Sequence, residues 1–196
     1  MTQSSNWVKF YLDRQMAVPP GQVFQYASGC PNTVAAILHH IVGEPVDKYA
    51  EKVLFGPLGI KATRWDYEPN MSRPTFGPCE IFMQPRDMAR MGELYLNEGF
   101  LDGHQIVPAK WVEYSKIDHG NNYGNYWWHH REEGYFSIAA LGYGGQYIFV
   151  TPEIELVVVI TSRWQINSST AKAQKNKNFD LWRNNILPAV NRDVTY

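Results

Sequence analysis

The sequence is poor in cysteine and has no excess of charge of either sign. Cys30 and Cys79 are the two cysteines in 196 residues, which excludes a disulfide framework as the basis of the fold. Eighteen basic and nineteen acidic residues give a net charge of −1. Since the charges form no long runs, neither a nucleic-acid surface nor a polybasic membrane contact is predicted.

Long apolar runs are also missing, so no membrane span is predicted. Leu156 to Ile160 has the length of a strand. Met1-Thr-Gln-Ser-Ser lacks the basic and apolar stretches of a signal peptide, so no signal peptide is expected and the compartment stays open. The histidine pairs His39-His40 and His129-His130 lack the i, i+4 spacing of a helical metal site, and we expect no metal and no cofactor.

Apolar and aromatic residues are plentiful. Hydrophobic residues make up 44% of the chain and aromatic residues 14%, enough for a sizeable core. The aromatic residues are consistent either with a core or with an aromatic-lined cleft. A small buried side chain is the expectation for Cys30.

Helical periodicity dominates the first part of the chain, and strands follow. Helices are expected over 7–15, 31–43, 45–54, 85–97 and 108–114. Runs rich in Ile, Val, Tyr and Phe predict strands over 135–141, 146–151 and 156–162, which would form an antiparallel three-stranded meander. The polar stretch 167–178 precedes a last helix over about 179–186. Helices followed by strands indicate an α+β fold, and the meander alone would leave a strand edge unpaired.

The segment from Gln22 to Asn32 contains Tyr26-Ala-Ser28-Gly, and Phe55-Gly-Pro-Leu-Gly-Ile60 follows it after a periodic helix. This pattern resembles the second catalytic motif of serine hydrolases related to class C β-lactamases, DD-peptidases and their esterase and amide-hydrolase relatives. The resemblance implies that the Tyr26 hydroxyl relays a proton in acyl transfer, while Ser28 orients the catalytic lysine and the substrate. Serine in place of the asparagine found in class C β-lactamases points towards the esterase and amidase relatives. Without the flanking matches, Tyr26 would read as an ordinary loop tyrosine.

The segment Leu141-Gly-Tyr-Gly-Gly-Gln-Tyr-Ile-Phe-Val150 resembles the strand that carries the third motif of the same family. The resemblance implies that Gly144 and Gly145 let substrate approach the backbone and that a strand N–H forms half of an oxyanion hole. Because the motif has neither Lys nor His, Tyr143 or Gln146 would orient the substrate. The other interpretation is a tight hairpin in which the glycines serve the turn alone. A third match, Gln84 to Gly99, is structural, and its Gly92 allows close packing.

The family's Ser-x-x-Lys nucleophile motif is expected far upstream of Tyr26. Ser169-Thr-Ala-Lys172 fits that pattern, but nine Ser and nine Lys predict about 0.4 chance matches. Its place after the strands also differs from the family's order. We interpret it as a coincidence, and we expect the chain to be the C-terminal part of such an enzyme.

The sequence therefore predicts one partial β-lactamase-like (transpeptidase-like) domain over 1–196. Residues 7–117 would be its mostly helical, cleft-lining part, and 123–190 would hold the strands and C-terminal helix. The expected function is acyl transfer from an amide or ester, and we expect the chain to be inactive without the nucleophile segment. The alternative is a non-catalytic module that binds a peptide, glycan or ester. The expected partners are a small-molecule or peptide substrate and either the missing N-terminal segment or a second copy. The resemblance implies a periplasmic or secreted location for many relatives.

Overall fold

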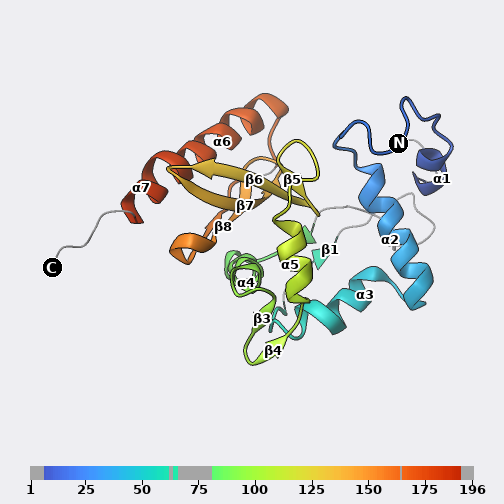
Figure 1. The fold of residues 1–196 in the computed structure, drawn as a ribbon, viewed down its shortest axis with the longest axis horizontal. Helices are drawn as coiled ribbons and strands as arrows, with labels where there is room; N and C mark the ends of the chain where they lie inside the picture. Colours follow the sequence, from blue (N-terminus) through green and yellow to red (C-terminus); the bar gives the residue numbers. More distant parts are fainter. Residues whose placement is uncertain (1–6, 62–63, 66–80, 164, 191–196) are drawn as a thin grey trace. The chain divides into compact units, whose positions relative to one another are not determined.

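The computed structural model describes residues 7–61, 64–65, 81–163 and 165–190 (Figure 1). The chain divides into two compact units, Met1–Gln84 and Pro85–Tyr196. Cys79 and most of 61–85 lie outside the described residues.

The first unit is mostly helical. Its elements are α1 (Trp7–Leu12), α2 (Gly29–Val42), α3 (Val46–Ala50), the π-helical turn η1 (Glu51–Phe55) and the antiparallel pair β1 (Arg64–Trp65) and β2 (Ile81–Phe82). The predicted end of α2 is confirmed, because Gly43 adopts a left-handed φ of 73° and its N–H donates to the His39 carbonyl. α1 ends at Leu12, three residues earlier than predicted.

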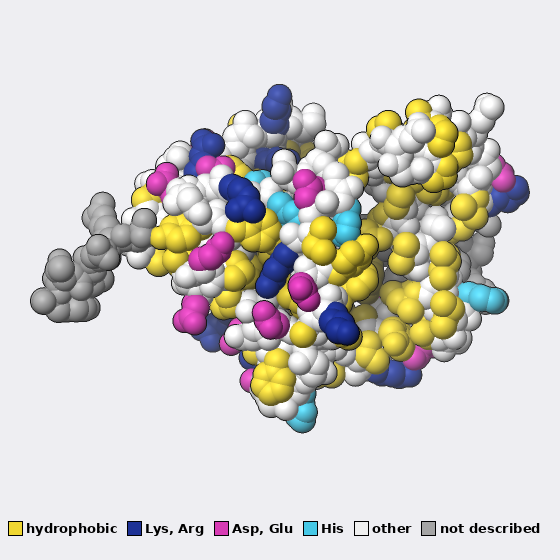
Figure 2. All heavy atoms as spheres, in the orientation of Figure 1, with side chains coloured by type: hydrophobic (Ala, Val, Ile, Leu, Met, Phe, Trp, Pro, Cys, Tyr) yellow, Lys and Arg dark blue, Asp and Glu magenta, His cyan; other side chains and the backbone are white. Residues whose placement is uncertain are grey.

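One face of α2 exposes apolar side chains. Figure 2 shows hydrophobic side chains on the visible face of the first unit, and α2 contributes Val34, Ile37 and Ile41, which are 51, 54 and 74% exposed. Their i, i+3, i+7 spacing places them on one stripe of the helix. Such a stripe normally packs against another element.

The second unit contains the sheet. Its elements are α4 (Pro85–Leu96), β3 (Phe100–Leu101), β4 (His104–Gln105), α5 (Ala109–Ser115), β5 (Tyr123–Gly124), β6 (Trp127–Glu132), β7 (Tyr135–Gly142), β8 (Gln146–Thr151), the 3₁₀ turn η2 (Pro152–Ile154), β9 (Leu156–Ile160), α6 (Ser168–Leu181), the π-helical turn η3 (Trp182–Ile186) and α7 (Leu187–Val190). This sequence of helices, meander and terminal helix confirms the predicted α+β fold class.

The sheet is larger than the three-stranded meander. Among the described residues, five strands pair in the order β5-β6-β7-β8-β9, with every pairing antiparallel. The three predicted strands are β7, β8 and β9. The sequence did not predict β6, because the buried residue His129 is not apolar and the sequence Trp-Trp-His-His-Arg-Glu shows no apolar alternation. In the described part of the chain, no strand pairs with the outer edge of β9.

Each face of the sheet is covered by helices. Ile148 and Val150 of β8 face the core shared with α4 and α5, whereas Tyr147 and Phe149 face the core shared with η3 and α7. This alternation follows from the two-residue period of a strand, and it makes β8 a strand buried on both faces. Figure 1 shows α6 running along one face of the sheet. The predicted packing role of Gly92 is confirmed, since a Cβ there would lie 2.5 Å from Val157 Cγ1.

The C-terminal helix begins eleven residues before the predicted start. Asn167 caps α6, because its side chain accepts a hydrogen bond from Thr170 N at 2.9 Å. The stretch 167–178 was predicted to be non-helical because its inward positions are polar or small. Ala171, Gln174 and Asn178 follow at i, i+3, i+7, and only Ala171 is apolar.

An aromatic cluster joins the helical end of the chain to the sheet. Trp182 stacks on Phe149 with ring centroids 4.1 Å apart, and Phe179 meets Trp182 edge-on at 5.2 Å. The His130 ring lies 5.0 Å from the Phe179 ring and 5.9 Å from the Trp182 ring. His130 Nε2 is buried and makes no hydrogen bond within the described residues. Burial lowers the pKa of His130 to about 4, and the neighbouring His129 acts in the same direction.

Acid is expected to destabilise the protein through His130. The folded-state pKa lies below the ordinary value of 6.5, so the unfolded chain binds the proton more tightly. The contribution to stability is therefore complete above pH 6.5 and is lost as the pH falls towards 4. Because the ring is only partly buried, we expect a loss of about 2 kcal/mol in unfolding free energy. Urea titrations from pH 7 to 4 would measure it, and His130→Phe should flatten that dependence by the same amount. An equal dependence of the unfolding free energy on pH in the original protein and in His130→Phe would contradict the assignment.

Candidate active site

Tyr26-Ala-Ser28 lies directly before α2, in the first unit. Tyr26 is 62% exposed, and Ser28 occupies the position before the first residue of the helix. A serine in this position usually accepts a hydrogen bond from the first helical turn. The Ser28 side chain makes no such capping bond. Its hydroxyl is therefore not used to stabilise the helix.

Gly29 lets α1 pack against the start of α2. A Cβ at Gly29 would lie 2.0 Å from Cδ2 of Tyr11, so the tyrosine ring covers the position where a side chain would stand. The Tyr11 hydroxyl lies 3.0 Å from Cys30 Sγ, and this hydrogen bond raises the pKa of Tyr11. The prediction of a buried Cys30 is wrong, because the first turn of α2 leaves this thiol exposed. The Ser-Gly-Cys sequence thus places two exposed polar side chains beside the covered glycine.

Asn32 is an unusual residue one turn into α2. It is fully buried, and neither Oδ1 nor Nδ2 has a hydrogen-bond partner among the described residues. A buried amide without partners costs on the order of 1–3 kcal/mol for each unmade interaction. This helical turn therefore carries a polar group that packing alone does not explain.

The four predicted substrate-binding residues form the β7–β8 hairpin in the second unit. Gly142 pairs with Gln146, and Tyr143, Gly144 and Gly145 make the three-residue loop between them. Gly144 and Gly145 have φ values of 74° and 89°, a conformation that other residues rarely adopt. These backbone angles support the interpretation of Gly144 and Gly145 as turn residues. A contact between the glycines and substrate is a separate hypothesis.

Polar side chains of α6 hold this hairpin. Gln174 Nε2 donates to the Gly144 carbonyl at 2.6 Å, and Asn178 Nδ2 donates to the Gly145 carbonyl at 3.0 Å. Sequence reasoning missed both residues, because polar side chains in a polar stretch give no periodic signal. Their spacing of four residues is the one feature of the sequence that could have placed them on a shared helix face.

Gln146 is tied to the chain that follows β9. Its Nε2 donates to the Ser162 carbonyl at 2.6 Å, and its Oε1 accepts from Ser162 N at 3.0 Å. Both ends of the amide are thus occupied. Tyr143, which is 59% exposed, donates its hydroxyl to the Ile166 carbonyl at 3.3 Å.

A cavity of about 280 Å³ adjoins the hairpin. Its walls come from Leu141 to Gly144 and from Ser168, Ala171, Lys172 and Lys175 of α6. The third motif contains no cation in sequence, yet the fold brings two lysines to the same cavity. Lys172 is the lysine of the Ser-x-x-Lys match, whose Ser169 is exposed and donates its hydroxyl to Asn167 Oδ1 at 2.8 Å.

Gly145→Ala is expected to destabilise the hairpin by about 2–3 kcal/mol. The change forces a left-handed φ on alanine, and its Cβ would lie 2.7 Å from Asn178 Nδ2. Gly134→Ala is the matched control, since Gly134 has a similar φ of 85° with nothing within 4 Å of the added Cβ. We expect it to lose about 1 kcal/mol, the strain alone. Equal losses in chemical denaturation would show that the contact with α6 has no part in the effect.

The structure brings Tyr143, Gly144, Gly145 and Gln146 together in the second unit and places Tyr26 and Ser28 together in the first. Within the described residues, no cluster of three His, Cys, Asp or Glu side chains has the geometry to hold a metal ion. None of the described helices is both long and apolar enough to cross a bilayer.

Comparison with known proteins gives a consistent result. Residues 2–178 match the sequence model of the family described as Beta-lactamase. No protein with a curated description matches the chain. A solved structure of a candidate 6-aminohexanoate-dimer hydrolase from Bacillus anthracis aligns with a TM-score of 0.67 and 25% identity, over 89% of this chain and 47% of the neighbour.

Two further solved structures agree in fold. A candidate β-lactamase from Bacteroides dorei aligns with a TM-score of 0.66 and 12% identity, over 89% of this chain and 62% of its own. A β-lactamase from Mycobacterium bovis aligns with a TM-score of 0.64 and 16% identity, over 86% of this chain and 66% of its own. This chain thus spans between 47% and 66% of the length of these neighbours. The family match covers most of the sequence, and the chain belongs to the β-lactamase family of serine hydrolases.

Proposed function

We propose that this chain forms part of a serine hydrolase that cleaves an amide or ester through an acyl-enzyme. The observation that carries the proposal is the family match over residues 2–178, together with Tyr26-Ala-Ser28 at the start of α2. The Tyr26 side chain is exposed, and the Ser28 hydroxyl is not used as a helix cap. That is the arrangement the resemblance requires of a proton-relay motif.

The proposed roles follow from these positions. Tyr26 passes a proton to the leaving group, and Ser28 orients the substrate. Tyr143, Gly144 and Gly145 approach the substrate along the hairpin, where a strand N–H contributes to an oxyanion hole. Gln146 contributes by holding the start of β8, because both ends of its amide already pair with Ser162.

An amide with a free carboxylate fits the hairpin cavity as substrate. Lys172 and Lys175 line that cavity and carry no ion-pair partner among the described residues. The neighbour from Bacillus anthracis is named for a 6-aminohexanoate dimer, which is an amide with a terminal carboxylate. We propose this class of substrate for the chain, and not that particular compound.

We also propose that both units belong to one β-lactamase-like domain, since the family match runs across the boundary at Gln84. The outer edge of β9 and the exposed stripe of α2 are where a further segment or a second copy would pack. An unpaired strand edge readily accepts another strand.

A non-catalytic binding module is the second candidate, and one observation favours it. The sequence contains a single Ser-x-x-Lys, and its Ser169 is exposed at the start of α6, with its hydroxyl bonded to Asn167. A nucleophile needs an activating base within hydrogen-bond reach. The Ser169 hydroxyl donates instead to the amide oxygen of Asn167, which is not a base that could activate it.

The chain by itself is expected to be inactive. It should not hydrolyse p-nitrophenyl esters or nitrocefin, and intact mass spectrometry should detect no adduct with a serine-directed fluorophosphonate. A form that also carries the family's Ser-x-x-Lys segment should be labelled once, at that serine, and should turn over esters or amides. Labelling of this chain at Ser169, abolished by Ser169→Ala, would contradict the assignment. If the longer form binds ester analogues without turnover or labelling, the binding module is the correct function.

A further inference from the structure

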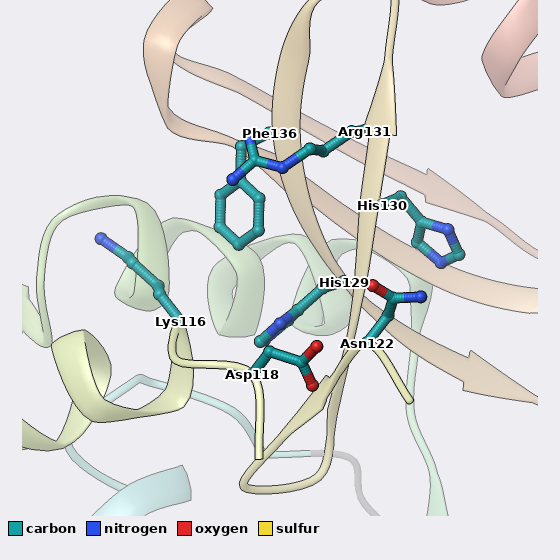
Figure 3. Close-up of a pocket in the computed structure, with 7 residues that line it drawn as sticks. All are labelled: Lys116, Asp118, Asn122, His129, His130, Arg131 and Phe136. Atoms are coloured by element: carbon teal, nitrogen blue, oxygen red, sulfur yellow. The ribbon is translucent and has the colours of Figure 1, made fainter. Parts of the chain in front are cut away.

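A second cavity lies in the same unit as the hairpin but at the opposite end of the strands. It has a volume of about 500 Å³ and opens between the end of α5 and strands β6 and β7 (Figure 3). Phe136, one of its lining residues, stands six positions before Gly142 on β7. At about 3.3 Å per residue, the two positions are roughly 20 Å apart. Among the described residues, none lines both cavities, so this cavity is distinct from the hairpin cavity.

Two cations from different elements reach this cavity. Lys116 follows the last residue of α5, and Arg131 lies on β6 opposite Phe136 of β7. The Arg131 guanidinium lies 5.0 Å from the centre of the Phe136 ring, which holds it over an aromatic face. Within the described part of the chain, neither cation forms a salt bridge.

Asp118, the one acid among the lining residues, is already occupied. Its Oδ1 accepts hydrogen bonds from Gly120 N at 2.7 Å and from Tyr123 N at 3.2 Å. These bonds lower the pKa of Asp118, so its charge is stabilised by the loop backbone. The carboxylate therefore shapes the loop that borders the cavity, and within the described residues it forms no salt bridge with Lys116 or Arg131.

Imidazole groups complete the polar lining. His129 is buried, and its Nε2 donates to the Ser115 carbonyl at 2.8 Å because a carbonyl oxygen only accepts. Because side chains alternate along β6, His129 lies on the same side of the strand as Arg131 and His130 lies on the other side, as Figure 3 shows. The cavity thus combines a fork-shaped guanidinium, an ammonium group and an aromatic wall.

We propose that this cavity, whose lining residues differ from those of the hairpin cavity, binds a small multivalent anion of phosphate or dicarboxylate type. A guanidinium can form two parallel hydrogen bonds with such an anion, and the ammonium group neutralises its second charge. The volume lies within the range of small-molecule sites.

Isothermal titration of the full chain with inorganic phosphate and with succinate tests the proposal, with sodium chloride at matched ionic strength as the reference. We expect saturable binding of at least one probe. Arg131→Gln and Lys116→Gln should each weaken it by at least about tenfold, the effect of losing one charge-assisted hydrogen bond. Lys110→Gln, which removes the same charge from an exposed position on α5, should leave binding unchanged.

The two probes identify the ligand class. Binding of phosphate alone assigns a phosphate site, and binding of both probes assigns a general dianion site. Circular dichroism of each variant shows that the fold is retained. The proposal is overturned if neither probe binds beyond the chloride reference, if Lys110→Gln weakens binding equally, or if Lys172→Gln abolishes binding while Arg131→Gln does not.

Discussion

Replacing Tyr26 with phenylalanine is expected to lower kcat/KM by about 10²–10⁴ in an active hydrolase that contains this chain. The substitution keeps the ring and removes only the hydroxyl that would pass the proton in acylation. A positioned acid–base group typically contributes a factor of this size. Unfolding free energy should change by only about 1 kcal/mol, the net worth of one hydrogen bond, because the side chain is 62% exposed.

Ser28→Ala is the companion variant for this measurement. Ser28 makes no capping bond to α2, so its loss should not unfold the helix. We expect a smaller fall in kcat/KM than for Tyr26→Phe, because an orienting contact is removed and the proton relay is kept. Steady-state kinetics on an activated ester and on an amide would compare the two. Nearly normal turnover by Tyr26→Phe would show that the tyrosine is structural.

Trp182→Ala is expected to lower the unfolding free energy of the protein by about 3–5 kcal/mol, the usual loss for a buried aromatic residue. Trp182 is fully buried and stacks on Phe149 at 4.1 Å with an interplanar angle of 3°. The substitution would leave a cavity between the sheet and the C-terminal helices. The midpoint of urea denaturation would measure the loss.

The adjacent Leu181 provides the control for Trp182. It is 44% exposed, and Leu181→Ala should lose less than about 1 kcal/mol. Trp182→Phe should fall between the two, since its smaller ring keeps part of the stack and removes an indole N–H that has no partner among the described residues. A loss in Trp182→Ala no larger than in Leu181→Ala would show that the aromatic cluster does not stabilise the unit.

The candidate site was only partly visible in the sequence. The glycines of the hairpin and the end of α2 at Gly43 were found because turn residues and helix ends have local signatures, whereas α2 begins two residues before the expected start at Pro31. Gln174 and Asn178 were missed, since side chains that bond to a backbone carbonyl need not be apolar or periodic. The exposure of Cys30 was predicted wrongly, because it depends on which face of the first turn of α2 is covered by Tyr11.

The amino-acid sequence was enough to identify the family, the helix-then-strand order and the three strands rich in β-branched and aromatic residues. These features depend on local propensity, hydrophobic period and motif spacing, all of which can be read along the chain. The pairing of β6 in the sheet and the start of α6 at Ser168 depend instead on contacts made in the folded chain. Tertiary contacts also place lysines from α6 along the hairpin cavity, and Lys116 and Arg131 along a second one. Such contacts join residues far apart in sequence, and polar side chains that make them leave no periodic pattern for a sequence to show.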